Sequence, residues 1–152
     1  MPSSLIRIAV GVTAAALPVA TVFAAAALPS STTDGVFTQE QAARGKQLYQ
    51  ARCAMCHGQN LEGTYEIVPL KGRFLANWQR APLGRLVDYV GRTMPQMAPG
   101  SLQPDENAAV VAYILQENGM PAGGRSMPTD PAALDAVTID SRPRARPGGK
   151  SE

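Results

Sequence analysis

The stretch Cys53-Ala54-Met55-Cys56-His57 contains both cysteines and the only histidine of this 152-residue chain. Two thiols separated by two residues lie about one helical turn apart, and the imidazole follows directly. This spacing allows two thioether bonds to the vinyl groups of a haem while the imidazole binds its iron. The stretch therefore predicts one covalently bound haem c, attached at Cys53 and Cys56 and ligated by His57.

Three other interpretations of the same stretch are weaker. A thioredoxin-like redox pair requires a βαβ context and gives His57 no role. A structural zinc site needs four ligands, whereas the chain has three Cys and His side chains in total. A disulfide between Cys53 and Cys56 would close so short a loop that it would stabilise the chain little.

The second axial ligand of such a haem cannot be a histidine, and methionine is the natural partner for electron transfer. Met55 lies within the attachment turn, on the wrong side of the haem. Met120 and Met127 lie at or beyond the end of the last predicted helix. Met94 and Met97 remain as the two candidates.

Caps and hydrophobic spacing predict three helices. The first begins at Thr38, where Gln41 completes a capping box, and leads to the cysteines. The second covers residues 83 to about 92, with apolar residues at helical spacing. The third begins at Pro104, a favoured first helical position, and ends at Asn118-Gly119. Because no segment alternates like a strand, the mature domain is predicted to be all-α.

The N-terminal end has the composition of an export signal. A basic start is followed by an apolar run and by small residues at 24–27, which predicts a signal peptide over 1–27 with cleavage at about 24–27. The alternative is an uncleaved membrane anchor, because about 20 apolar residues also span a bilayer. The export signal predicts that the protein is periplasmic. It would be held at the membrane only if this N-terminal segment is not cleaved. Residues 28–35 are predicted to be a short linker.

The other end of the chain shows no apolar periodicity. Residues 124–152 are rich in Pro, Gly, Ala and Arg, so we expect a disordered tail, with at most one helical turn around 132–137. The ordered domain is thereby limited to residues 36–123. So small a domain usually needs an additional stabilising element, such as a disulfide, a metal or a cofactor. The scarcity of aromatic residues (5%) is consistent with a haem filling its core.

The charge composition argues against nucleic acid as a partner. The formal net charge is +2 and 17% of the residues are charged, far from the dense basic surface that neutralises several phosphates.

Beyond the attachment stretch, the sequence resembles the monohaem class I c-type cytochromes, in particular the haem domains found with bacterial quinone-cofactor (PQQ) dehydrogenases. The resemblance covers about residues 36–123 and implies a small cytochrome c fold, with three main helices around one covalently attached haem. It rests on Gly45-x-x-x-Tyr49, the Cys53–His57 stretch, Pro69-Leu70-Lys71-Gly72-x-Phe74-x-x-x-Trp78, Thr93-Met94-Pro95, Pro99-Gly100-Ser101-Leu102, Val111-Ala112-Tyr113-Ile114-Leu115 and Asn118-Gly119.

The resemblance also implies roles for individual residues. The methionine of the Met-Pro pair in this family is the distal ligand, which selects Met94 and leaves Met97 as the alternative. Pro69 matches the proline whose carbonyl accepts a hydrogen bond from the ligand histidine. Trp78 is expected to shield or hydrogen-bond a haem propionate, with an ordinary core tryptophan as the alternative.

The expected function is electron transfer rather than enzymatic catalysis. The protein would carry single electrons in the periplasm between a redox protein donor, such as a PQQ-dependent dehydrogenase, and a respiratory acceptor. One alternative is a haem subunit held permanently in an oxidoreductase complex. Another is a haem protein with an open ligand-binding site, although the chain offers no second histidine to handle protons there.

Overall fold

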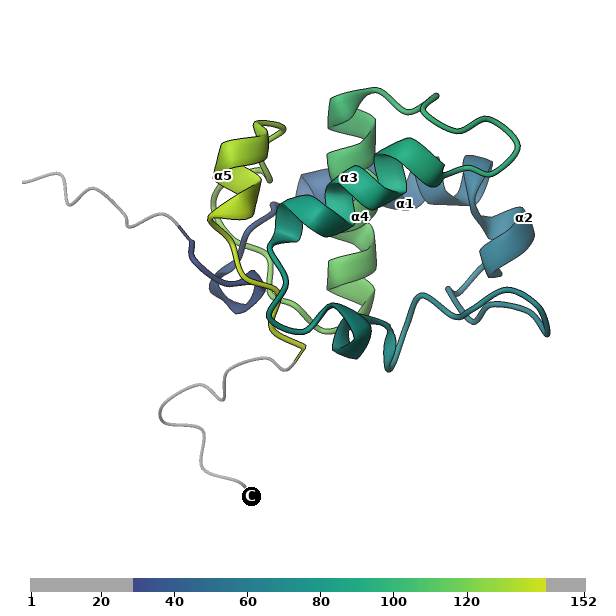
Figure 1. Cartoon of the computed structure of the whole chain (residues 1–152), viewed down its shortest axis with the longest axis horizontal. Coiled ribbons are helices and arrows are strands. Elements are labelled where there is room, and N and C mark those ends of the chain that lie inside the picture. The colour runs from purple at the N-terminus through teal and green to yellow at the C-terminus, as the bar shows by residue number, and fades with distance from the viewer. Residues whose placement is uncertain (1–28, 142–152) are drawn as a thin grey trace, which may run out of the picture.

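The computed structural model describes residues 29–141, so the predicted signal peptide and the last residues of the predicted tail lie outside the described residues. None of the helices in this range has the length and apolar character needed to cross a bilayer. Residues 29–141 contain isolated β-bridges but no strand. The elements, in chain order, are η1 (Thr32–Asp34), α1 (Gln39–Arg52), α2 (Ala54–His57), η2 (Phe74–Trp78), α3 (Leu83–Thr93), α4 (Pro104–Glu117) and α5 (Pro131–Asp135) (Figure 1).

The all-α fold with three main helices is confirmed, and the predicted helix ends lie close to those observed. The Thr38 side chain accepts a hydrogen bond from the backbone N–H of Gln41, at 3.1 Å, and so caps α1. Pro104 is the first residue of α4, and Gly119, at φ 83°, follows its end.

Helices α1 and α4 cross at close range. Gly45 lies against the backbone of α4, where a methyl group in its place would overlap the carbonyl oxygen of Ala109. One turn later the rings of Tyr49 and Tyr113 pack with centroids 5.4 Å apart. Both tyrosines are buried and belong to a small apolar cluster that faces α2. The crossing therefore fixes where α1 delivers the chain to Cys53.

Helix α3 covers the main core with one face. Its buried residues are Leu83, Leu86, Val87 and Val90, at the spacing of a single helical stripe. The helix ends at Thr93, and the N–H of Met94 still bonds to the carbonyl of Val90 at 2.9 Å. The end of α3 thus holds Met94 beside the core.

The segment 124–141 corrects our expectation of a disordered tail. It contains α5, and its apolar side chains Met127, Leu134, Val137 and Ile139 are at most 4% exposed in the main core. These residues lack the periodicity of an isolated element because their partners lie elsewhere in the chain.

The predicted linker contributes to the same part of the fold. Thr32 is fully buried, and its N–H bonds to the carbonyl of Thr138 at 3.0 Å, while the N–H of Thr138 bonds to Ser30. Ile139 pairs in the same way with Arg80 and Ala81. The fold therefore extends beyond the predicted limits of 36 and 123 at both ends.

Candidate functional site

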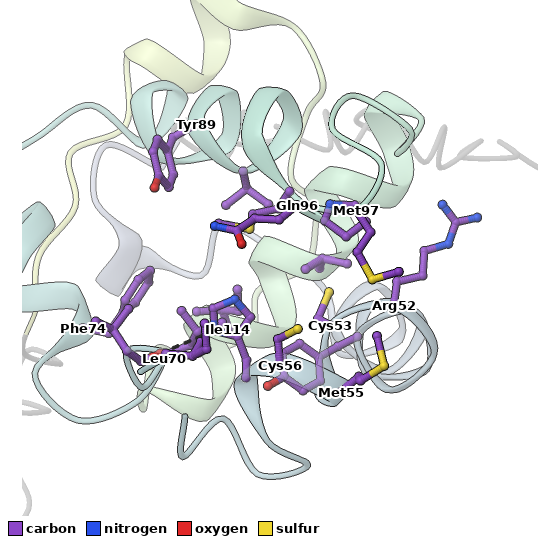
Figure 2. Close-up of a pocket in the computed structure, with 18 of the residues that line it drawn as sticks. Arg52, Cys53, Met55, Cys56, Leu70, Phe74, Tyr89, Gln96, Met97 and Ile114 are labelled. Atoms are coloured by element: carbon purple, nitrogen blue, oxygen red, sulfur yellow. Dashed lines mark hydrogen bonds between the residues drawn. The ribbon is translucent and has the colours of Figure 1, made fainter. Parts of the chain in front are cut away.

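A cavity of about 320 Å³ opens beside α2 (Figure 2). Figure 2 shows the cysteine sulfurs at one side of this cavity and Phe74 and Tyr89 at the other. Most of its wall is apolar, as is typical of cofactor pockets. The wall includes Tyr49, Cys53, Cys56, His57, Val68, Leu70, Phe74, Tyr89, Val90, Met94, Pro95, Met97, Val110 and Ile114.

The predicted attachment residues all border this cavity. Cys53 is the residue between α1 and α2, while Cys56 and His57 lie within α2. The N–H of His57 bonds to the carbonyl of Cys53 at 2.9 Å, so that a single helical turn fixes their spacing. Cys53 is half-buried and Cys56 is exposed, which places one thiol deeper in the cavity than the other.

The electrostatics of Cys53 differ from those of a redox-active cysteine pair. Burial raises the pKa of the Cys53 thiol to about 11, and the nearby Arg52 lowers it by less. Because redox-active pairs rely on a lowered thiol pKa, this shift does not favour the thioredoxin-like interpretation. Among residues 29–141, no group of three Cys, His, Asp or Glu side chains is arranged to bind a metal ion.

The structure brings a different carbonyl to His57 from the one that the resemblance implies. The Nδ1 atom of His57 lies 3.4 Å from the carbonyl oxygen of Val68, which precedes Pro69. A residue before proline is held extended, and successive carbonyls of an extended chain point in opposite directions. Only one of the two can therefore face the ring, and in this structure it is that of Val68.

The two candidate methionines occupy different environments. Met94 is partly buried and packs against the main core, whereas the Met97 side chain is 82% exposed at the cavity mouth. Both line the cavity. Met120 and Met127, which the sequence made poor candidates, are buried in the main core instead.

Trp78 does not line the cavity but supports two residues that do. Its ring packs between those of Phe74 and Tyr89, with centroid distances of 6.5 and 5.6 Å. The role of Tyr89 is not apparent from the sequence, because it lies outside the buried stripe of α3. By contrast, Val110 and Ile114 share one face of the predicted third helix, which is the signal that identifies them as wall residues.

This donor set fits a haem c. Two thiols and an imidazole border an apolar cavity from one side, and a methionine held by the end of α3 borders it as well. Cys53 and Cys56 would hold the group covalently, and His57 would supply the proximal ligand.

The fold and this site define the class of protein: the chain contains a small all-α cytochrome c domain. Residues 40–114 match the family model described as "Cytochrome C oxidase, cbb3-type, subunit III". The match includes all but the first residue of α1, the attachment stretch, α3 and most of α4.

The chain is similar to one curated protein and to one solved structure. The chain is 29% identical over 107 residues, 66% of its length, to a thiosulfate dehydrogenase from Stutzerimonas stutzeri (strain A1501), and spans 32% of that protein. The crystal structure of the sulfane dehydrogenase SoxCD from Paracoccus pantotrophus aligns with a TM-score of 0.44 and 23% identity, covering 59% of this chain and 54% of that one.

Proposed function

We propose that this protein is a monohaem c-type cytochrome that transfers single electrons in the periplasm and is not itself the catalyst of a substrate reaction. When bound, the haem supplies one-electron redox chemistry through its iron. The observation that carries the proposal is that Cys53, Cys56, His57 and Met94 all border one apolar cavity in a cytochrome c domain.

Within the proposed site, each residue has a distinct task. Cys53 and Cys56 would anchor the haem, and His57 of α2 would supply an iron ligand. Met94 is the proposed distal ligand because the core and the end of α3 hold it, whereas Met97 is largely exposed. A ligand that is already held loses less conformational freedom on binding.

The surroundings of the cavity mouth favour brief contacts with redox partners. The exposed large apolar side chains include Met55, Val68, Tyr89 and Met97, and all four line the cavity. An apolar rim of this kind suits a small transient interface better than steering by charge.

The proposed electron donor is a dehydrogenase. The relative in Stutzerimonas stutzeri is named a thiosulfate dehydrogenase, and this supports a donor that oxidises sulfur compounds. A donor containing PQQ is a proposal that rests on the sequence resemblance alone. The acceptor would be a component of the respiratory chain.

A haem domain held permanently in a larger oxidoreductase is the second candidate. It is favoured by one observation: the chain corresponds to about a third of the thiosulfate dehydrogenase that it matches. Size-exclusion chromatography of the protein from its native membrane or periplasmic fraction separates the two candidates, since a carrier elutes as a small protein.

The ligand assignment is tested by substitution in the haem-loaded protein. Met94→Ala is expected to abolish the weak long-wavelength absorption of the ferric protein that reports a methionine sulfur on iron, and to allow rapid carbon monoxide binding after reduction. Met97→Ala is the matched control and should retain the band. Loss of the band in Met97→Ala alone would assign the ligand to Met97, and haem released by acid extraction would contradict covalent attachment.

A further inference from the structure

The loop over residues 58–72 is attached to the helices at both of its ends. At its beginning, the hydroxyl of Tyr49 donates to the carbonyl of Gly58 at 2.7 Å, and the side chain of Gln50 donates to that of Gln59 at 2.8 Å. Both donors come from α1. The start of the loop is therefore fixed directly after His57.

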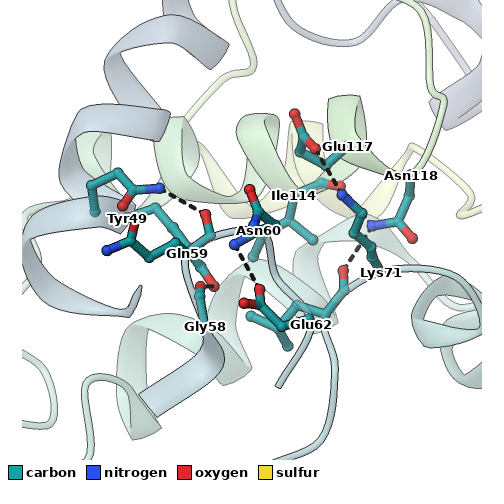
Figure 3. A network of polar contacts seen from close by, with 11 residues as sticks. Tyr49, Gly58, Gln59, Asn60, Glu62, Lys71, Ile114, Glu117 and Asn118 are labelled. Carbon is teal, nitrogen blue, oxygen red and sulfur yellow. Dashed lines mark hydrogen bonds and ion pairs between the residues drawn. The ribbon is translucent and has the colours of Figure 1, made fainter. Parts of the chain in front are cut away.

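The end of the loop is fixed by α4 (Figure 3). The Nδ2 atom of Asn118 donates to the carbonyl oxygens of Leu70, at 2.8 Å, and Ile114, at 2.7 Å. Next to it, Lys71 forms an ion pair with Glu117 at 3.3 Å, partly exposed to solvent. Exposed pairs contribute little, so the amide of Asn118 is the stronger attachment.

The amide of Asn118 is oriented for its donor group. Both hydrogens of Nδ2 face carbonyl oxygens, while the buried Oδ1 has no hydrogen-bond partner in the described structure. Turning the amide over would place Oδ1 against two carbonyls. Asn118 therefore uses both hydrogens of its amide as donors and leaves its amide oxygen as one unpaired acceptor.

Between its two attachments the loop is anchored at Leu61, which is fully buried in the small apolar cluster and accepts a hydrogen bond from the N–H of Leu70 at 2.9 Å. The tip over residues 63–68 has little support. Tyr65 is fully exposed and Val68 is 67% exposed. The hydrogen bonds around this tip are local. The N–H of Thr64 donates to the carbonyl of Ile67, and the N–H of Ile67 donates to the hydroxyl of Thr64. The N–H of Gly63 donates to the carbonyl of His57. The residue nearest to the Val68 carbonyl that is bonded outside this tip is thus Leu70, two residues along the chain, whose N–H bonds to Leu61 and whose carbonyl accepts from Asn118.

We propose that Asn118 is a positioning residue for His57. By holding the carbonyl of Leu70, it keeps the carbonyl of Val68 at the Nδ1 atom of the ring, 3.4 Å away. This inference rests on the proposed function, in which His57 is the proximal iron ligand. A ring N–H that donates to a carbonyl makes the histidine a more basic ligand, which stabilises the oxidised iron.

The test is the reduction potential of the haem-loaded full chain. Asn118→Ala should raise the potential, because a released Val68 carbonyl no longer polarises the ring. It should also speed solvent exchange of the His57 ring N–H, followed by NMR of the reduced protein, while the methionine–iron band is retained.

Two control variants separate positioning from general stability. Gln116→Ala removes an amide of α4 that donates to the side-chain oxygen of Gln39 on α1, at 2.7 Å. Leu134→Ala removes the buried side chain of α5, far along the chain from the loop, and should lower the unfolding temperature. Neither should change the potential or the exchange rate of the ring N–H.

A second variant at the same position keeps the shape of the side chain. Asn118→Asp replaces the donor by a carboxylate that cannot donate when ionised, so it should raise the exchange rate as Asn118→Ala does. Values for both variants equal to those of the controls would overturn the inference. A wild-type protein without covalent haem would instead contradict the proposed function, and the two failures are thus distinguishable.

Discussion

Tyr49 connects the helix crossing to the attachment stretch. Its ring packs against Tyr113, and its hydroxyl donates to the carbonyl of Gly58, directly after His57. The side chain is fully buried, and burial is the main reason why the pKa of Tyr49 is raised above its usual value of 10.0. The buried phenol is therefore neutral over the whole range in which the protein is expected to function.

Replacing Tyr49 with Phe removes this hydrogen bond with little change of shape. We expect the free energy of unfolding at neutral pH to fall by about 1 kcal/mol, with the Gly58 carbonyl left without this donor. Urea titration followed by circular dichroism measures the change. An unchanged stability at neutral pH would show that the hydroxyl contributes nothing.

The difference in stability between the wild type and Tyr49→Phe is predicted to depend on pH. An unfolded tyrosine ionises near pH 10, whereas the folded Tyr49 keeps its proton to higher pH. The stability that the neutral buried phenol contributes is complete below pH 10 and is lost as the pH rises further toward the folded pKa. The stability advantage of the wild type over Tyr49→Phe should therefore shrink above pH 10.

At the scale of elements, the distance between α1 and α4 depends on Gly45. A methyl group there would overlap the backbone of Ala109, which is not the flexible end of a side chain and cannot turn aside. The two helices carry both tyrosines of the small cluster, and Tyr49 of α1 lines the cavity together with Val110 and Ile114 of α4. Any change in their separation is thus transmitted to the site.

Gly45→Ala is expected to destabilise the protein by about 1–3 kcal/mol, as overpacking does. The sign of this change in stability is informative, because a Gly-to-Ala substitution in an unobstructed helix would stabilise the protein by about 1 kcal/mol. Gly124→Ala, at a position where a methyl group meets nothing within 4 Å, is the matched control. Thermal unfolding of both variants would contradict the close crossing if Gly45→Ala were the more stable.

At the scale of the whole molecule, residues 124–141 complete the main core. Ile139 is fully buried, and its backbone pairs with that of Arg80 and Ala81 ahead of α3. Asp140 adds a hydrogen bond from Ser31 at 2.5 Å. The segment thus joins the beginning of the described chain to the loop between η2 and α3.

Ile139→Ala should lower the free energy of unfolding by about 2–5 kcal/mol, because it opens a cavity in a packed core. Ser126→Ala changes an exposed residue of the same segment and should have almost no effect. Chemical denaturation of the two variants provides the comparison. Equal stabilities would support the disordered tail that the sequence suggests.

The sequence predicts what is encoded locally. The three main helices follow from caps and apolar spacing, and the attachment residues are adjacent in the chain, so that one helical turn brings them together. The role of residues 124–141 depends instead on pairing with Ser30, Arg80 and neighbouring residues far away in sequence, which no local pattern records. The carbonyl nearest to His57 Nδ1 in this structure is that of Val68, one residue before Pro69, because the resemblance identifies the loop but not which of its carbonyls faces the ring.

The pairing of Ser30 with Thr138 has a geometrical consequence. It brings the two end segments of the described chain together, on the part of the molecule away from α2 (Figure 1). A domain whose two chain ends lie close together can be inserted into a larger protein, or attached to one, at a single place on its surface. Attachment at that place would leave the side of the domain that carries α2 accessible to a redox partner.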